Sequence, residues 1–219
     1  MRLTKTFLIL ILSFISINAD AKRDKVVVFS AEIDKFNTNL DDGLYNKFLR
    51  KLERVSKIKF DIKYFPPIRA KKKYLQSKDS CYFPLSLDET NAKKEDSLLS
   101  KSIGDIFLYG IRLKSSQKKE IGSFAYRSLY KEGVSFGGKK KGYPVVYGEQ
   151  LIEMLDRKRV DFIYASIPDI YLYFENGKAD FDKKYIVDSN IPVKRVSDYF
   201  ACKGLEENQS VITKINKIL

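Results

Sequence analysis

The sequence predicts an α/β protein built as two lobes with a cleft between them. Short runs of β-branched and aromatic residues alternate with stretches whose apolar residues recur at helical spacing. This alternation is typical of α/β proteins with mostly parallel sheets. One series of strands and helices runs to about residue 112, a second begins near Ile121, and a last strand and helix follow it. Two lobes would account for this order.

The first series begins with a strand at residues 25–29 and a helix whose predicted apolar face carries Leu44, Phe48, Leu52 and Val55. A second strand at residues 59–65 ends at two prolines, and a short helix through Ile68 and Leu75 leads to a third strand at 81–86. That helix also carries Lys71, Lys72 and Lys73, which we expect mostly on its solvated side. A fourth strand is expected within residues 99–114.

The second series opens at residues 120–130, where the pattern predicts a short strand, a turn at Gly122–Ser123 and a helix. Residues 137–174 then read as a loop, a strand, a helix, a strand and a helix. A strand within 196–204 and an amphipathic helix from Ser210, which would cap it, end the sequence.

The first residues have the pattern of a secretory signal peptide. Arg2 and Lys5 supply positive charge, residues 7–17 are apolar, and Ala19-Asp20-Ala21 is a small-x-small cleavage pattern. The apolar stretch is shorter than the roughly 20 residues that a membrane-spanning helix needs. We therefore expect cleavage after Ala21 and an exported protein, which in a Gram-negative bacterium would be periplasmic.

The composition argues against several functions. The net charge is +13, but its lysines are spread over the chain among acidic residues, so a nucleic-acid partner is not expected. An anionic ligand or an anionic membrane surface stays open. The chain has no histidine, which removes histidine-dependent hydrolase triads and most catalytic zinc sites. We expect no metal or other cofactor.

Five stretches carry a resemblance to a known family. They are DDGLYNKFLRKLER (41–54), PPIRAKKKYLQSKDS (66–80), ETNAKKEDSLLSKSI (89–103), EQLIEMLDRKRVDFIYAS (149–166) and VSDYFACKG followed by VITKINKIL (196–219). In this order they resemble segments of the bacterial extracellular solute-binding proteins of family 3, the two-lobed receptors of ABC importers. The resemblance covers essentially the whole exported chain.

The resemblance implies a type II periplasmic binding protein fold. Lobe 1 would comprise residues 23–108 and 192–219, lobe 2 residues 109–191, and two crossing segments would form the hinge. A monomer would capture a small polar or anionic solute by hinge closure and present it to an ABC permease or a membrane sensor. No chemistry on the ligand is expected.

The resemblance also points to ligand-binding residues. Lys93, with Lys94 as the register alternative, stands where the family has the arginine that clamps the α-carboxylate of an amino acid. Ser166 stands where an aspartate holds the α-ammonium group. Because lysine is not equivalent to arginine and serine carries no charge, these departures argue against an ordinary α-amino acid.

Further candidates for the site come from strand ends and turns. Gly122 and Ser123 would face the cleft and could receive an anion on free backbone N–H groups, or serve as a plain helix cap. Glu32 follows the first strand and is either a cleft residue or a solvated loop acid. Ser86 lies in the segment that leads from the third strand towards the cleft. Asp161 is expected to have a structural role at the start of its strand.

Cys81 and Cys202 both belong to the first lobe by the resemblance. Two cysteines in an exported chain favour a disulfide, while two buried free thiols are the alternative. A disulfide that closes so long a loop would contribute about 4 kcal/mol in the chain-entropy model.

Two other functions fit the same scaffold. A partner for a signalling receptor would use this fold with a degenerate cleft, which agrees with the altered positions 93 and 166. An enzyme such as a dehydratase would need a cleft carboxylate with a raised pKa, and Glu32 is the candidate.

Overall fold

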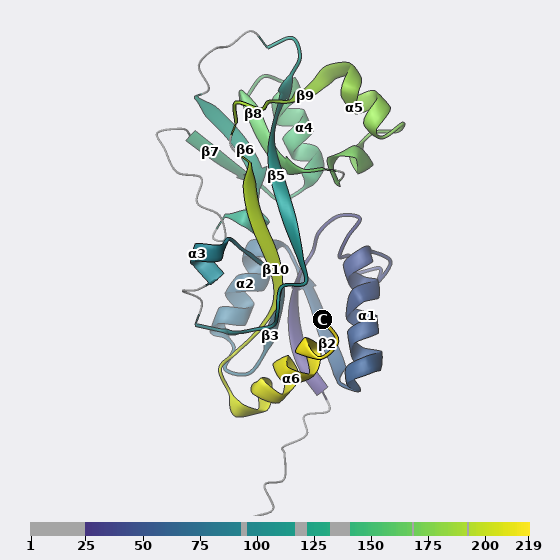
Figure 1. Ribbon diagram of the computed structural model, residues 1–219, viewed down its shortest axis with the longest axis vertical. Coiled ribbons are helices and arrows are strands. Elements are labelled where there is room, and N and C mark those ends of the chain that lie inside the picture. The colour runs from purple at the N-terminus through teal and green to yellow at the C-terminus, as the bar shows by residue number, and fades with distance from the viewer. Residues whose placement is uncertain (1–24, 93–95, 117–121, 132–140, 168, 192) are drawn as a thin grey trace, which may run out of the picture.

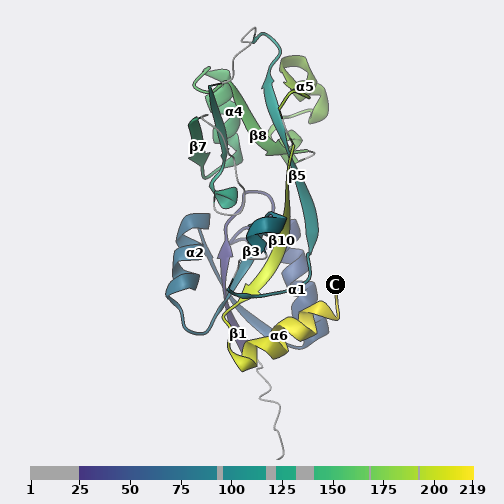
Figure 2. The same ribbon diagram turned by 60° about the vertical axis from the view of Figure 1, so that its left-hand side comes forward.

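Two long antiparallel strands, β5 (Gly104–Leu113) and β10 (Lys194–Cys202), run along the length of the molecule and connect two α/β lobes (Figure 1). This computed structural model describes residues 25–92, 96–116, 122–131, 141–167, 169–191 and 193–219. The predicted signal peptide and Lys93 lie outside these residues. Figure 2 shows the same two strands passing between the lobes from a second direction.

Lobe 1 is a sheet covered by helices. Its strands are β1 (Lys25–Ala31), β2 (Lys59–Phe65), β3 (Cys81–Leu87) and β4 (Leu98–Leu99). Its helices are α1 (Leu44–Ser56), α2 (Pro67–Gln76), α3 (Glu89–Ala92) and α6 (Glu206–Asn216). Strand β1 pairs in parallel with β2 and β3. All residues of β3 are buried, because β3 lies between β1 and β10 in the sheet.

Lobe 2 repeats this plan with shorter elements. Its strands are β6 (Ser123–Arg127), β7 (Lys141–Val145), β8 (Phe162–Ser166) and β9 (Tyr185–Val187). Its helices are α4 (Gly148–Asp156), α5 (Lys178–Lys184) and the short 3₁₀ helices η1 (Ser128–Tyr130) and η2 (Asp169–Tyr173). Strand β6 pairs in parallel with β7 and β8.

The strands of both lobes belong to one hydrogen-bonded sheet. Among the described residues its order is β2-β1-β3-β10-β5-β8-β6-β7, with β4 on β10 and β9 on β5. The expectation of mostly parallel pairing therefore holds inside each lobe only. The crossing strands pair antiparallel, because β10 returns to lobe 1 beside the strand that left it. The expected boundaries at 108/109 and 191/192 stay a prediction.

Each lobe has its own hydrophobic core. In lobe 1, Leu52 of α1 packs with Phe83 of β3 and Phe200 of β10. In lobe 2, Leu151 and other residues of α4 pack with strands β5 and β8. No helix among the described residues is long and apolar enough to cross a membrane.

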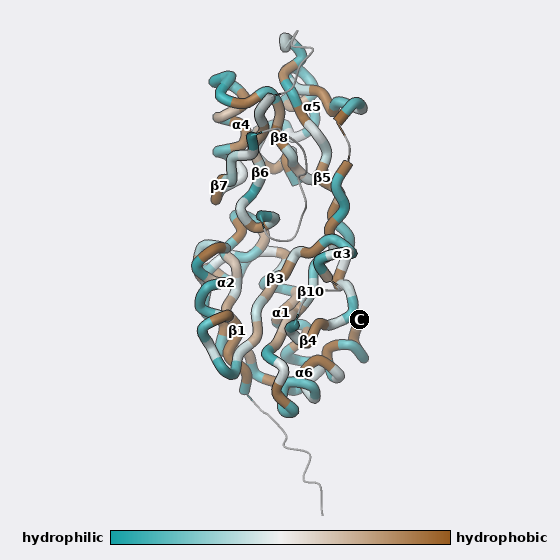
Figure 3. The backbone as a smooth tube through the Cα atoms, turned by 90° about the vertical axis from the view of Figure 1, so that its left-hand side faces the viewer, coloured by the Kyte–Doolittle hydropathy of each residue, from teal (hydrophilic) through white to brown (hydrophobic). Residues whose placement is uncertain are grey.

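Two details of the predicted helices are wrong. Leu44 and Val55 of α1 are 61% and 55% exposed, whereas Leu49 and Leu52 are buried. Apolar residues occupy more of the circumference of α1 than the part that packs on the sheet. The spacing of apolar residues alone therefore predicted a face that is rotated away from the buried one. Helix α2 runs through Ile68 and Leu75 as predicted; both side chains are exposed, and Ala70 and Tyr74 are buried. Figure 3 shows hydrophobic and hydrophilic segments alternating along α2 and α6. Helix α6 begins at Glu206, so Ser210 lies inside it and does not cap it.

The predicted disulfide is confirmed. Cys81 and Cys202 face each other in the register of β3 and β10, with their Cα atoms 4.0 Å apart and their sulfurs bonded. Both residues are fully buried in the lobe 1 core. The bond therefore ties the returning end of the chain to the centre of the first sheet.

Removing this bond should destabilise the protein without changing its fold. We expect the double variant Cys81→Ala, Cys202→Ala to lose about 2 to 5 kcal/mol of unfolding free energy in a urea titration, because the unfolded chain regains the entropy of an open loop. Wild-type protein treated with a reductant is the control and should approach the variant. Equal stability of the variant and the oxidised wild type would contradict this role.

Candidate functional site

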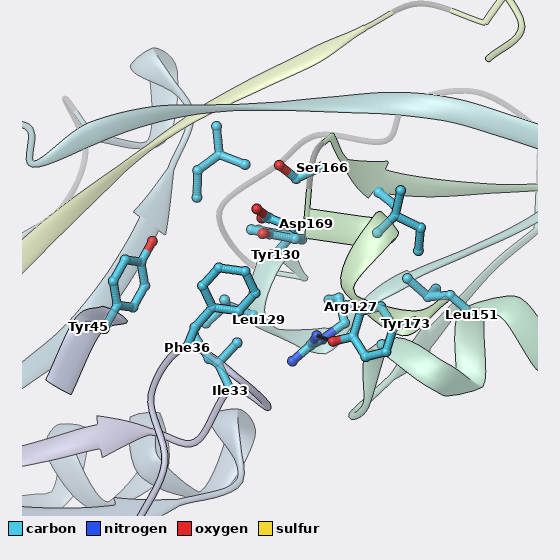
Figure 4. Close-up of a pocket in the computed structure, with 14 residues that line it drawn as sticks. Ile33, Phe36, Tyr45, Arg127, Leu129, Tyr130, Leu151, Ser166, Asp169 and Tyr173 are labelled. Atoms are coloured by element: carbon cyan, nitrogen blue, oxygen red, sulfur yellow. Dashed lines mark hydrogen bonds between the residues drawn. The ribbon is translucent and has the colours of Figure 1, made fainter. Parts of the chain in front are cut away.

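A cavity of about 50 Å³, here called the interlobe cavity, lies where the lobes meet beside the crossing strands. Lobe 1 contributes an apolar and aromatic wall of Ile33, Phe36 and Tyr45. Lobe 2 contributes polar groups, which are Arg127, Ser166, Asp169 and Tyr173. Figure 4 shows these two sets of side chains on opposite sides of the cavity.

The polar wall follows from the pairing of β6 and β8. Arg127 is the last residue of β6 and Ser166 the last residue of β8. The carboxyl ends of parallel strands meet at one edge of a sheet, so residues far apart in sequence converge there. Helices η1 and η2 then turn the chain sharply and place Tyr130 and Asp169 at the same edge.

Arg127 is a buried cation whose hydrogen-bonding capacity is only partly used. Its side chain donates from Nη1 to the Tyr173 hydroxyl at 3.1 Å, and its Nη2 lies 3.8 Å from an oxygen of Asp34. Its Nε and Nη2 have no hydrogen-bond partner within the described part of the chain. Unsatisfied buried donors are costly, so an anionic group entering the cavity would find a strong partner here.

Asp169 places a carboxyl group in the same cavity. Burial raises its pKa, and a hydrogen bond from the Ser166 hydroxyl and the charge of Arg127 partly oppose that rise. The cavity therefore presents a cation and an acid side by side. Asp169 is also a cleft carboxylate with a raised pKa, the feature that we expected of Glu32 for an enzyme such as a dehydratase.

A second buried acid, Asp198 of β10, lies behind the lobe 1 wall. It accepts hydrogen bonds from the hydroxyl groups of Tyr45 and Ser86. Burial raises the pKa of Asp198, hydrogen bonds from Ser86 and Tyr45 oppose the rise, and the charge of Asp169 adds to it. This network fixes the Tyr45 ring against the cavity.

Contacts between the lobes form what we call the interlobe clasp, made by Asp34 and Lys35 of lobe 1 with Gly148, Leu172 and Tyr173 of lobe 2. The Asp34 carboxylate accepts hydrogen bonds from the Tyr173 hydroxyl at 2.9 Å and from the Gly148 amide at 3.3 Å. Lys35 donates to the Leu172 carbonyl oxygen. The protein's own charges thus join the two lobes at the rim of the cavity.

The loop that carries the clasp is held by side-chain amides. Asn37 donates to the Ser30 hydroxyl at 2.8 Å, and Asn46 accepts from the amides of Thr38 and Gly43 at 2.9 and 3.0 Å. A Cβ atom at Gly43 would lie 2.1 Å from the Phe36 carbonyl oxygen, so only glycine fits there. These contacts within lobe 1 hold the loop that carries Asp34.

The structure brings two of the predicted site residues near the cleft. Ser166 lines the interlobe cavity, and Ser86 lines a neighbouring cavity while its hydroxyl donates to Asp198. Glu32 follows β1, where its amide donates to the Phe65 carbonyl oxygen, and it does not line the interlobe cavity. Lys93 and Lys94 lie outside the described residues.

The prediction of a helix-capping turn at Gly122–Ser123 is wrong. Strand β6 begins at Ser123 and its other end, at Arg127, reaches the cavity, so the turn into a helix comes at η1 instead. The amides of Gly122 and Ser123 each donate to Asp161 at 3.0 Å, and the Ser123 hydroxyl does so at 3.2 Å. These groups are therefore engaged with Asp161, whose structural role agrees with expectation.

Sequence reasoning missed Arg127, Asp169, Asp34 and Tyr173. A signal existed for the first two, because each follows a buried strand of parallel type, where polar residues meet at the sheet edge. The contact between Asp34 and Tyr173 joins residues 139 positions apart and leaves no local pattern.

Comparisons with known proteins agree with this architecture. No family model and no curated protein matches the sequence. The ligand-binding core of GluR0 from Nostoc punctiforme, solved with L-glutamate, is 12% identical over 88% of this chain and 93% of its own, with a TM-score of 0.63. The arginine-bound form of ArgBP from T. maritima is 13% identical over 89% and 94%, with a TM-score of 0.63.

The periplasmic VFT2 domain of BvgS from Bordetella pertussis is also similar. It is 14% identical over 87% of this chain and 85% of its own, with a TM-score of 0.61. Identities this low show the fold alone. The chain has the two-lobed type II periplasmic binding protein fold, as the resemblance to family 3 solute-binding proteins predicts.

The clasp should set the balance between open and closed lobes. We expect Asp34→Ala to increase the radius of gyration measured by small-angle X-ray scattering, because two hydrogen bonds and one charge contact across the cleft are lost. Glu175→Ala, which removes an exposed carboxylate of lobe 2, is the control. The clasp has no such role if both variants scatter like the wild type.

Asp169 should make stability depend on pH with a defined sign. Because burial raises its pKa above the ordinary 3.8, the folded state holds the proton more tightly than the unfolded state. Its stabilising contribution is complete below pH 3.8 and is lost as the pH rises through the raised pKa. We expect Asp169→Asn to raise the melting temperature at neutral pH, and this gain to shrink towards pH 3.8. A gain that stays constant across this range would refute the assignment.

Proposed function

We propose that this protein is an exported solute-binding protein that captures a small polar or anionic solute between its lobes by hinge closure. The observation that carries the proposal is the buried Arg127 guanidinium in the interlobe cavity, two of whose nitrogens lack hydrogen-bond partners in the described structure. Burying a charged group costs free energy when some of its hydrogen-bond donors have no partner. Proteins commonly keep such a group where a ligand supplies the missing partner.

The polar groups of the cavity suggest the chemistry of the solute. Arg127 would pair with a carboxylate or another planar anionic group, for which a guanidinium is well suited. Asp169 and Ser166 would accept or donate hydrogen bonds to a second polar group, and the Asp169 carboxylate would favour a cation. The solved structures of GluR0 and ArgBP with glutamate and arginine support a solute of this kind.

Closure would use contacts from both lobes. The apolar wall of Ile33 and Phe36 belongs to lobe 1, whereas Arg127 and Asp169 belong to lobe 2. A solute that touches both walls binds the closed state better than the open state, and this difference drives the population towards closure. The proposal also includes export to the periplasm and delivery of the solute to an ABC permease. It includes ligand-binding roles for Glu32, Ser86, Lys93 and Ser166.

A sensor that reports to a membrane receptor is the second candidate. The interlobe clasp favours it, because Asp34 and Lys35 join the lobes through groups of the protein itself. Closure through such contacts does not require a solute. The similarity to a BvgS periplasmic domain supports this alternative. Neighbouring genes for a permease and an ATPase, as opposed to a sensor gene, would separate the two.

A thermal-shift screen against amino acids, organic acids and small sugars tests the proposal. A binder at 100 times its Kd should add about 2.7 kcal/mol of stability. For that binder we expect Arg127→Gln and Asp169→Asn to lose the shift, because each removes a charge that the solute contacts.

Arg159→Gln is the matched control, since it removes an exposed arginine from the same lobe, and it should keep the full shift. The solute site would be misassigned if Arg127→Gln bound as tightly as Arg159→Gln. A screen without any response would favour the sensor.

A further inference from the structure

A second cavity of about 50 Å³ lies between the lobes next to the first, and we call it the α2–η1 cavity. Lobe 1 lines it with the start of α2 and with β3, and lobe 2 lines it with η1 and the residue that follows. Leu129 lines both cavities and so forms the wall between them. A cavity of this size has room for a few water molecules or one small anion, since a single water needs roughly 10 to 15 Å³.

The charged residues that line this cavity in the described structure are two lysines. Lys71 comes from α2 of lobe 1, and Lys131 follows η1 in lobe 2. Among the described residues that line the cavity, none is acidic. Asp198 lies behind Ser86, where it is hydrogen-bonded to that residue and to Tyr45, and burial raises its pKa. An anion in the cavity would therefore meet one cation from each lobe.

Two further features of the cavity favour a bound anion. Ser128 is only 6% exposed, and its hydroxyl has no hydrogen-bond partner in the described part of the chain. Helix α2 starts at the cavity with Pro67 and Ile68, without a side-chain cap and without an acidic residue in its first turn. The N-terminus of a helix carries partial positive charge and free amide groups, which favours bound anions. Pro66 and Pro67 have no N–H group and the Ala70 amide donates to the Pro66 carbonyl oxygen, so the amides that this helix start can offer are those of Ile68 and Arg69.

We propose that the α2–η1 cavity binds a small oxyanion, such as a phosphate or sulfate, between the two lobes. Lys71 and Lys131 neutralise its charge, the Ser128 hydroxyl donates to one oxygen, and the amides of Ile68 and Arg69 in the first turn of α2 donate to another. Because the cations belong to different lobes, the bound anion stabilises the closed arrangement. This site is separate from the solute site at Arg127, so either can exist without the other.

The anion is either free in solution or the acidic group of a larger solute whose body reaches the interlobe cavity past Leu129. Inorganic phosphate and glycerol 3-phosphate distinguish these sources. Equal affinity for both identifies a free anion, whereas tighter binding of the ester that is lost in Arg127→Gln identifies the larger solute. Both results support an oxyanion site.

The test is a titration of the purified protein with inorganic phosphate, followed by calorimetry and by the melting temperature at constant ionic strength. We expect saturable binding and a higher melting temperature. Lys131→Ala and Ser128→Ala should each weaken phosphate binding, the former by roughly tenfold, as the loss of a charge-assisted hydrogen bond implies.

The matched control is Lys72→Ala, which removes an exposed lysine from the same helix outside the cavity and should bind phosphate like the wild type. The proposal is overturned if phosphate does not bind, or if Lys131→Ala and Lys72→Ala bind it equally. A failed solute screen beside intact phosphate binding would count against the solute site alone.

Discussion

The antiparallel pairing of β5 and β10 is the constraint on which the rest of the structure depends. Five residues of each strand are in register, from Lys194 opposite Leu108 to Asp198 opposite Gly104. This ladder carries the sheet from one lobe into the other, and the disulfide at the end of β10 anchors it in lobe 1. Each lobe buries its own core, and the crossing strands connect the two cores.

The cleft chemistry follows from this arrangement. Parallel strands in lobe 2 end at the cleft, where the residues beyond the buried segments no longer have to be apolar. Arg127 and Asp169 stand at these ends, opposite an aromatic wall of lobe 1. The low dielectric of such a buried site would strengthen the contacts of a charged solute of the proposed kind, and it makes donors without a partner, such as Nε and Nη2 of Arg127, costly. Because the charged groups belong to lobe 2 and the apolar wall belongs to lobe 1, a solute would contact both kinds of group only when the lobes are closed.

Contacts between the lobes divide the cleft into three parts, which are the clasp, the interlobe cavity and the α2–η1 cavity. The clasp at Asp34 joins the lobes at one rim, Leu129 lines both small cavities, and Lys71 and Lys131 line the second of them. The lysine run of α2 thus has two roles. Lys72 and Lys73 are exposed, as a solvated helix face predicts, whereas Lys71 is partly buried at the second cavity.

The sequence by itself determined most of the elements and the two-lobed α/β class. For Cys81 and Cys202 it left two alternatives, a disulfide or two buried free thiols. Local patterns suffice for the elements and the class, because the periodicity of a strand or helix is a property of neighbouring residues, and the class follows from the order of the elements. Only the tertiary structure decided which helix face is buried, that Gly122–Ser123 begins a strand, and that Arg127, Asp169 and Asp34 meet. Those outcomes depend on contacts between residues that are far apart in the sequence, from the 39 positions between Gly122 and Asp161 to the 139 between Asp34 and Tyr173.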